Sequence, residues 1–295
     1  MFKKALSIFL IFTLVFLFAS CGADKDSSES NNNSNVFNPD APTITQAVDD
    51  ADKPADNGKY AKVTVPEGYT LLKTAWLLEE NGVCSTDDFI NAVSNYDTSK
   101  YSVLSSIHDR DKICFLLEGY LFPATYTFEK NSDPTKVIDK MVATEEKKFT
   151  AEMRQRATEL GYSVHDILTI ASIIEKEAFT DEQRTLISST IHNRLKQNMK
   201  LEYDVTVKYC TGVIELKYPD KIDYYKYYYN GNRCKGLIAG PICNPGIASI
   251  KAALYPADTD YLFFVIDTNP PYNSAFTNSY EEHLKNVQKW KNGEL

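Results

Sequence analysis

Two glutamates, Glu175 and Glu177, lie in the apolar stretch Ala171-Ser-Ile-Ile-Glu-Lys-Glu177. Ser163 and Asp166 precede this stretch with the spacing of a capping box, which predicts that a helix begins there. At about 100° per residue, Glu175 lies between Leu168 and Val164 on the helical wheel, and Glu177 between Ile170 and Ile173. Both carboxyl groups are therefore expected among aliphatic side chains.

A carboxyl group surrounded by aliphatic side chains loses hydration, which disfavours its charged form. Such a group can hold a proton near neutral pH and donate it to a leaving oxygen. The alternative is a partly buried glutamate that is paired with a nearby Arg or Lys. The pattern alone does not decide between Glu175 and Glu177 as the acid.

The N-terminus resembles an export signal. Lys3 and Lys4 precede a charge-free apolar run over residues 5–19, as in a secretory signal peptide. Small residues then precede Cys21, as in a bacterial lipoprotein cleavage site. We expect a lipoprotein signal peptide over residues 1–20 and lipidation of Cys21, which would anchor the chain to the outer face of the cytoplasmic membrane. An ordinary signal peptide and an uncleaved anchor are the alternatives.

Residues 21–60 are rich in Ser, Asn and Asp, so they offer little apolar surface for burial. Such a composition predicts a disordered tether. The chain carries 32 basic and 40 acidic residues, and loss of Lys3 and Lys4 with the signal peptide leaves a net charge of −10. This charge disfavours a nucleic-acid partner. No Cys or His spacing matches a metal site, so neither a metal nor another cofactor is expected.

The fold class predicted for the rest of the chain is α+β. Residues 60–65 alternate like a strand, Thr70 and Ser85 are candidate caps of two helices, and residues 113–123 are expected to be extended. Strand, helix, helix, strand is the layout of a small LysM-like glycan-binding subdomain, which we assign to residues 61–130.

A mixed α/β catalytic domain is predicted over residues 131–295. Besides the helix with Glu175, the pattern predicts a helix over residues 181–199, a half-buried strand over 201–209 and a short helix over 248–254. A loop-rich segment with five nearly contiguous tyrosines is expected between 224 and 240. A buried strand over 261–266 and a helix capped by Ser279 complete the domain.

Several short motifs occur together in a known order. They are Glu118-Gly-Tyr-Leu-Phe-Pro123, Ala171-Ser-Ile-Ile-Glu-Lys-Glu177, Asn193-Arg-Leu195, Leu201-x-x-Asp204-x-Thr206, Tyr229-Asn230, Gly240-Pro-Ile-x-Asn-Pro-Gly246 and Tyr280-Glu-Glu-His283. With these motifs the chain resembles the endolytic murein transglycosylases, the MltG or YceG-like family. The resemblance runs from about Val63 to the C-terminus. It departs from the family pattern at Glu202, Val205 and Ser274, among other positions.

The resemblance implies that Glu175 is the catalytic acid. The reaction implied is cleavage of the β-1,4 bond between N-acetylmuramic acid and N-acetylglucosamine inside peptidoglycan strands, which leaves 1,6-anhydro ends. Polar side chains suited to binding acetamido sugars are Glu118, Asp204, Thr206, Asn230 and Asn244. Peptidoglycan synthases are the implied partners.

Two other classes of function remain open from the sequence. One is a non-catalytic cell-wall-binding lipoprotein, in which Glu175 is structural. The other is a hydrolytic muramidase, which needs two carboxyl groups flanking the scissile bond.

Overall fold

The computed structural model describes residues 58–295. The predicted signal peptide, Cys21 and nearly all of the predicted tether lie outside the described residues. Between residues 58 and 295 no helix is both long and apolar enough to cross a membrane.

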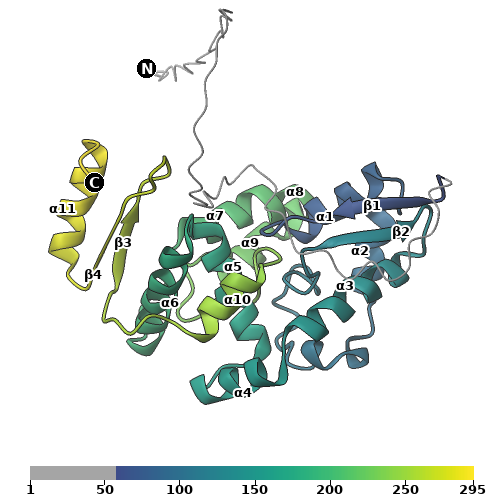
Figure 1. The fold of residues 1–295 in the computed structure, drawn as a ribbon, viewed down its shortest axis with the longest axis horizontal. Helices are drawn as coiled ribbons and strands as arrows, with labels where there is room; N and C mark the ends of the chain where they lie inside the picture. Colours follow the sequence, from purple (N-terminus) through teal and green to yellow (C-terminus); the bar gives the residue numbers. More distant parts are fainter. Residues whose placement is uncertain (1–57) are drawn as a thin grey trace, which may run out of the picture. The chain divides into compact units, whose positions relative to one another are not determined.

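The N-terminal part of the described chain runs strand, helix, helix and strand (Figure 1), but its second strand is not the segment that was predicted to be extended. Strand β1 (Tyr60–Thr64) pairs antiparallel with β2 (Thr125–Glu129), so that Tyr60 lies opposite Glu129. Helices α1 (Leu71–Glu80) and α2 (Thr86–Ser94) lie between the strands in sequence, and Thr70 and Ser85 cap them as predicted. Two short 3₁₀ turns, η1 (Thr98–Lys100) and η2 (Ser102–Leu104), follow α2.

The prediction of an extended segment over residues 113–123 was wrong, because this segment consists of turns. Burial of Leu117, Tyr120 and Leu121 does not alternate as it would in a strand with one buried face. Gly119 adopts φ 86°, where a side chain would be strained, and its Cα lies close to Pro241.

Two amphipathic helices, α3 (Pro134–Lys148) and α4 (Ala151–Leu160), follow β2 and were not predicted. The residues that begin and end these helices can nevertheless be recognised in the sequence. Asp133 caps α3 and Pro134 occupies its first turn, while Gly161 ends α4 in the left-handed conformation.

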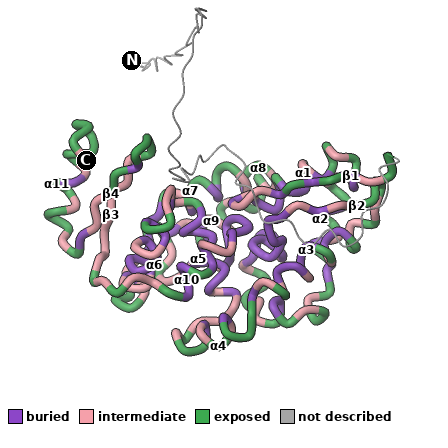
Figure 2. The backbone as a smooth tube through the Cα atoms, in the orientation of Figure 1, coloured by how far each residue is buried: buried purple, intermediate pink, exposed green. Residues whose placement is uncertain are grey.

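Helix α5 (Val164–Glu177) is buried on nearly all sides, since every residue from Ile167 to Glu175 is buried (Figure 2). The predicted capping box of Ser163 and Asp166 is confirmed. Helix α5 packs against α6 (Asp181–Lys196) and α10 (Ile247–Leu254).

The predicted strand over residues 201–209 was also wrong, because helix α7 (Asp204–Tyr209) begins at Asp204. Within α7 the buried residues are Thr206 and Tyr209, which are three residues apart, as on one face of a helix. The chain continues through a π-helical turn η3 (Cys210–Ile214), α8 (Glu215–Lys217), η4 (Pro219–Lys221) and α9 (Ile222–Tyr229). The tyrosine run predicted in a loop therefore lies on α9.

The C-terminal part is a hairpin of β3 (Phe263–Ile266) and β4 (Ser274–Thr277) that packs against α11 (Tyr280–Lys291). Ser279 caps α11 as predicted. The expected burial of β3 was too high, since all four of its residues are half-buried. The described chain is thus mostly helical with two small sheets, in agreement with the α+β prediction.

One hydrophobic core joins the N-terminal strands and helices to the central helices. Its buried members run from Ala61 in β1 to Leu254 in α10. The proposed boundary between a LysM-like subdomain over 61–130 and a catalytic domain over 131–295 stays a prediction.

Candidate active site

Glu175 lies in the last turn of α5 and is buried, with 5% of its surface exposed. Its Oε2 accepts hydrogen bonds from the Gly246 backbone amide at 3.1 Å and from Ser249 Oγ at 2.7 Å. Both donors come from the start of α10, the helix packed against α5. The expected burial of Glu175 is confirmed, and the donors to its carboxyl group are a backbone amide and a hydroxyl group rather than Arg or Lys.

The second oxygen of Glu175, Oε1, is buried and has no hydrogen-bond partner within residues 58–295. Buried polar atoms are almost always paired, and exceptions commonly mark a catalytic group or a site for a ligand. One oxygen of this carboxyl group is therefore held in place while the other is left for a reacting partner.

A second carboxyl group, that of Glu67, approaches the same place. Glu67 belongs to the turn between β1 and α1, and a Cβ atom built on Gly246 would lie 2.1 Å from its Cδ. Burial, reinforced by the charge of Glu175, raises the pKa of Glu67 to about 7, although the charge of Arg184 opposes the shift. Sequence reasoning missed Glu67, because no local pattern distinguishes a glutamate in the turn Pro66-Glu67-Gly68 from an ordinary exposed one.

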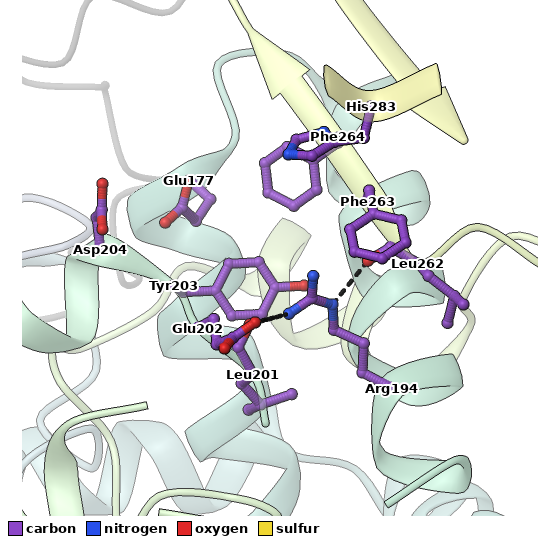
Figure 3. Close-up of a pocket in the computed structure, with 10 residues that line it drawn as sticks. All are labelled: Glu177, Arg194, Leu201, Glu202, Tyr203, Asp204, Leu262, Phe263, Phe264 and His283. Atoms are coloured by element: carbon purple, nitrogen blue, oxygen red, sulfur yellow. Dashed lines mark hydrogen bonds and ion pairs between the residues drawn. The ribbon is translucent and has the colours of Figure 1, made fainter. Parts of the chain in front are cut away.

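Glu177 lies in a different environment, an open pocket of about 290 Å³ (Figure 3). Asp204 lies on the same side of this pocket, while Arg194 makes an ion pair with Glu202 at 3.3 Å. Burial, and next the charge of Asp204, raise the pKa of Glu177 to about 7. The remaining lining residues are Leu201, Tyr203, Leu262, Phe263, Phe264 and His283. Glu175 does not line this pocket.

The residues predicted to bind sugar therefore divide into two groups. Asp204 is exposed at the start of α7 and faces the pocket with Glu177. Asn230 is half-buried, and its Oδ1 accepts a hydrogen bond from the Asn232 amide at 2.9 Å. These two side chains lie where a ligand can reach them.

Glu118, Asn244 and Thr206 are buried and bonded to the protein itself. Glu118 accepts hydrogen bonds from the Leu71 amide at 2.8 Å and the Tyr209 hydroxyl at 2.9 Å, and burial raises its pKa to about 8. Thr206 Oγ1 donates to the Tyr203 carbonyl at 2.7 Å. These hydrogen bonds within the protein indicate a structural role for the three side chains.

Asn244 joins two segments that are distant in sequence. Its Oδ1 accepts hydrogen bonds from the amides of Gly119 at 3.0 Å and Leu121 at 3.1 Å. Its Nδ2 donates to the Tyr69 carbonyl at 3.0 Å. Asn244 thus fixes the chain next to the turn that carries Glu67.

In the described part of the chain, no three His, Cys, Asp or Glu side chains lie together as metal ligands would. Cys84, Cys114, Cys210, Cys234 and Cys243 are free thiols.

A buried carboxyl group beside a second one, in a mostly helical α+β fold, defines a candidate acid–base enzyme. The sequence profile of the YceG-like family matches residues 40–289, so the chain belongs to the YceG-like family. The resemblance seen in the motifs is confirmed.

Two relatives are named endolytic murein transglycosylase. The Bacillus subtilis protein is 38% identical over 246 residues, which cover 79% of this chain and 66% of that protein. The Streptococcus pneumoniae protein is 31% identical over 259 residues, which cover 80% of this chain and 45% of that protein. The chain thus spans less than two thirds of the length of either relative.

A crystal structure of a YceG-like protein from Listeria monocytogenes is similar to this fold. The TM-score is 0.63 at 34% sequence identity, over 76% of this chain and 75% of that one.

Proposed function

We propose that this protein is an endolytic murein transglycosylase, a lyase that cuts the β-1,4 bond between N-acetylmuramic acid and N-acetylglucosamine inside peptidoglycan strands. The names of its relatives support this proposal. The single observation that carries it is the Glu175 carboxyl group, which is buried with Oε2 held by two donors and Oε1 unpaired.

In this reaction the protonated Glu175 donates its proton to the glycosidic oxygen as the bond to C1 of the muramic sugar breaks. The C6 hydroxyl oxygen of the same sugar then bonds to C1, and its proton passes to the Glu175 carboxylate. Glu175 ends protonated, no water is consumed, and the muramic product is a 1,6-anhydro sugar. Ser249 and the Gly246 amide orient the carboxyl group throughout both steps.

The same proposal assigns a role to each of the other predicted sugar-binding residues. Asp204 and Asn230 contact the acetamido sugars, since both are accessible. Glu118, Thr206 and Asn244 shape the substrate site through the backbone that they hold, rather than by direct contact.

The N-terminal strand–helix–helix–strand unit serves, in this proposal, as a LysM-like contact for the glycan strand. The lipid on Cys21 would place the enzyme on the outer face of the cytoplasmic membrane, beside the synthases that make new strands. The intact mass of the mature protein tests the anchor, because a mature form without added lipid contradicts it.

A hydrolytic muramidase is the second candidate, and one observation favours it. Glu67 provides a second carboxyl group next to Glu175, as a hydrolase requires.

Digestion of purified peptidoglycan tests the assignment of Glu175. Glu175→Gln is expected to reduce release of soluble fragments by at least about 10²-fold, because Gln cannot donate a carboxylic proton. Glu177→Gln is the matched control two residues away and is expected to retain activity within about fivefold. A folded Glu175→Gln protein with normal turnover, or an inactive Glu177→Gln beside an active Glu175→Gln, would remove the assignment.

A further inference from the structure

We propose that Glu67 is a positioning residue of the reaction, whose charge acts on the protonation of the neighbouring Glu175 carboxyl group. This inference rests on the proposed function, because it gives Glu67 a role in the step that Glu175 carries out. This role of Glu67 does not require contact between Glu67 and the sugar.

The turn that carries Glu67 is attached to the segment before α10 through the two residues that follow Glu67. The Gly68 amide donates to the Asn244 carbonyl at 2.9 Å, and the Asn244 amide donates to the Tyr69 carbonyl at 2.8 Å. Gly68 has φ 75°, and a Cβ atom there would lie 3.6 Å from Glu175 Cγ. The turn is therefore fixed directly against Glu175, which brings the two glutamates together although they are far apart in sequence.

Gly246 is the point at which the two carboxyl groups meet. Its amide binds Glu175 Oε2 at 3.1 Å, and a Cβ atom on it would lie 2.1 Å from Glu67 Oε1. The Gly246 backbone has φ −77° and ψ 167°, which any residue can adopt. Glycine at this position thus serves to make room for the Glu67 carboxyl group, rather than to allow an unusual backbone conformation.

The charges that face Glu67 come from two helices. Glu175 and Lys176 lie on α5, and Lys176 Nζ is 3.4 Å from the Gly68 carbonyl oxygen. Arg184 and Asp181 lie on α6 and are paired with each other. Burial raises the pKa of Glu67 to about 7, and Glu175 and Asp181 add to the shift while Arg184 opposes it. When two acidic groups lie in one buried place, the charge of each disfavours ionisation of the other.

This repulsion between the two carboxylates gives Glu67 a defined effect. A negative Glu67 beside Glu175 favours the protonated form of the acid, which is the form that starts the reaction. Removal of the charge at position 67 should let the site lose its proton at lower pH. Glu67 would therefore set the upper pH limit of activity and have little effect on substrate binding.

The test is the pH profile of peptidoglycan cleavage by wild type, Glu67→Gln and Glu67→Asp. With Glu67→Gln, the alkaline limb of kcat is expected to move down by about one pH unit, so activity relative to wild type falls about tenfold at pH 8 but less than about threefold at pH 5.5. KM should stay within about twofold. Glu67→Asp keeps the charge and should restore most of the alkaline limb.

Glu80→Gln, an exposed carboxyl group on α1, is the matched control and should leave the profile unchanged. A uniform loss of activity at every pH with Glu67→Gln would mean a structural role only and would overturn the proposal. If wild type itself does not cleave peptidoglycan, the proposed function fails instead, and the two failures are distinguishable.

A second measurement does not need activity. In protein with ¹³C-labelled glutamate, the carboxyl signal of Glu67 should titrate with a pKa of about 7 in wild type and at lower pH in Glu175→Gln, which removes the neighbouring charge. An unchanged midpoint in a folded Glu175→Gln protein would show that the two groups are not coupled, and would contradict the proposal.

Discussion

Glu145 and Glu146 are neighbours on α3 that lie in opposite environments. Both carboxyl oxygens of Glu145 are buried without a hydrogen-bond partner in the described chain, and burial raises its pKa to about 8. Burial also opposes ionisation of Glu146, but hydrogen bonds from Ser102 and Val103 and the charge of Arg154 outweigh it and lower the pKa of Glu146. The two residues should therefore respond to pH in opposite ways.

Because the pKa of Glu145 is raised on folding, its protonated form favours the folded state, and this stability is lost as pH rises from the unfolded value near 4.5 through about 8. Glu145→Gln is neutral at all pH, so its free energy of unfolding relative to wild type should rise with pH between 5.5 and 8, by at most about 1.4 kcal/mol per pH unit. Urea unfolding at several pH values measures this slope.

Glu146→Gln is the control for this slope. The lowered pKa of Glu146 means that its contribution is present above the unfolded value and is lost only as pH falls. The variant should be less stable than wild type by the same amount across pH 5.5–8. Parallel stability curves for Glu145→Gln and wild type would contradict the buried, protonated state of Glu145.

At the same scale, the sequence predicted part of the site. The burial of Glu175 follows from its place on the helical wheel, because α5 is packed on nearly all sides. The motif match directed attention to Glu175 rather than Glu177. Glu67 could not be predicted in this way, since its approach to Gly246 joins a turn and a loop that only the tertiary fold brings together.

Among the elements, Arg194 of α6 ties the C-terminal hairpin to the body of the protein. Its side chain donates to the carbonyls of Leu262 at 2.6 Å and Leu201 at 2.8 Å, and its guanidinium group lies 5.1 Å from the centre of the Phe263 ring. Arg194 is 8% exposed and Leu201 is buried, while Leu262 is half-buried. Loss of the Arg194 side chain therefore removes a donor from the Leu201 carbonyl at a place that solvent reaches poorly.

Arg194→Ala is expected to lower the free energy of unfolding by about 2–4 kcal/mol, because it takes the Arg194 donors from the buried Leu201 carbonyl and from the half-buried Leu262 carbonyl. Hydrogen exchange of β3 and β4 should become faster than that of α5. Arg194→Lys keeps the charge without the planar geometry and should lose less stability. A loss below about 0.5 kcal/mol in Arg194→Ala would contradict the role of Arg194 as a link between α6 and the hairpin.

The elements also show where pattern reasoning works. The caps at Thr70, Ser85, Ser163 and Ser279 were predicted correctly. A cap depends only on a side chain and the backbone amides two or three residues further on, so it can be recognised from a short stretch of sequence. Helix α7 was mistaken for a strand, because the apparent alternation of Leu201, Tyr203 and Val205 spans the loop that leads into the helix. A short helix that is stabilised by tertiary contacts contains too few residues for the helical period of apolar residues to be recognised in its sequence.

At the scale of the whole molecule, the α+β class followed from composition and periodicity, but the continuity of the core did not. The central helices α5, α6 and α10 surround Glu175, and the N-terminal turn reaches them through Asn244. The N-terminal unit therefore contributes Glu67 to the site, in addition to its proposed contact with the glycan. Long-range packing of this kind lies beyond the reach of local sequence patterns.

The presence of Glu67 makes the nature of the product the sharpest question for the whole enzyme. With one acid acting alone, the muramic C6 hydroxyl is the attacking group, and a positioned internal group outcompetes free water. If one carboxyl group acts as the acid and the second assists the attack of water, the bond is hydrolysed instead. The two reactions differ by one molecule of water in every new muramic end.

Mass analysis of the fragments released from purified peptidoglycan by the wild-type protein tests the central claim most directly. We expect mostly 1,6-anhydro-muramic ends, on fragments of a range of lengths that shows cuts inside the strands, and loss of all these fragments in Glu175→Gln. Fragments with mainly reducing ends, each heavier by one water, would contradict the transglycosylase account and make this protein a muramidase.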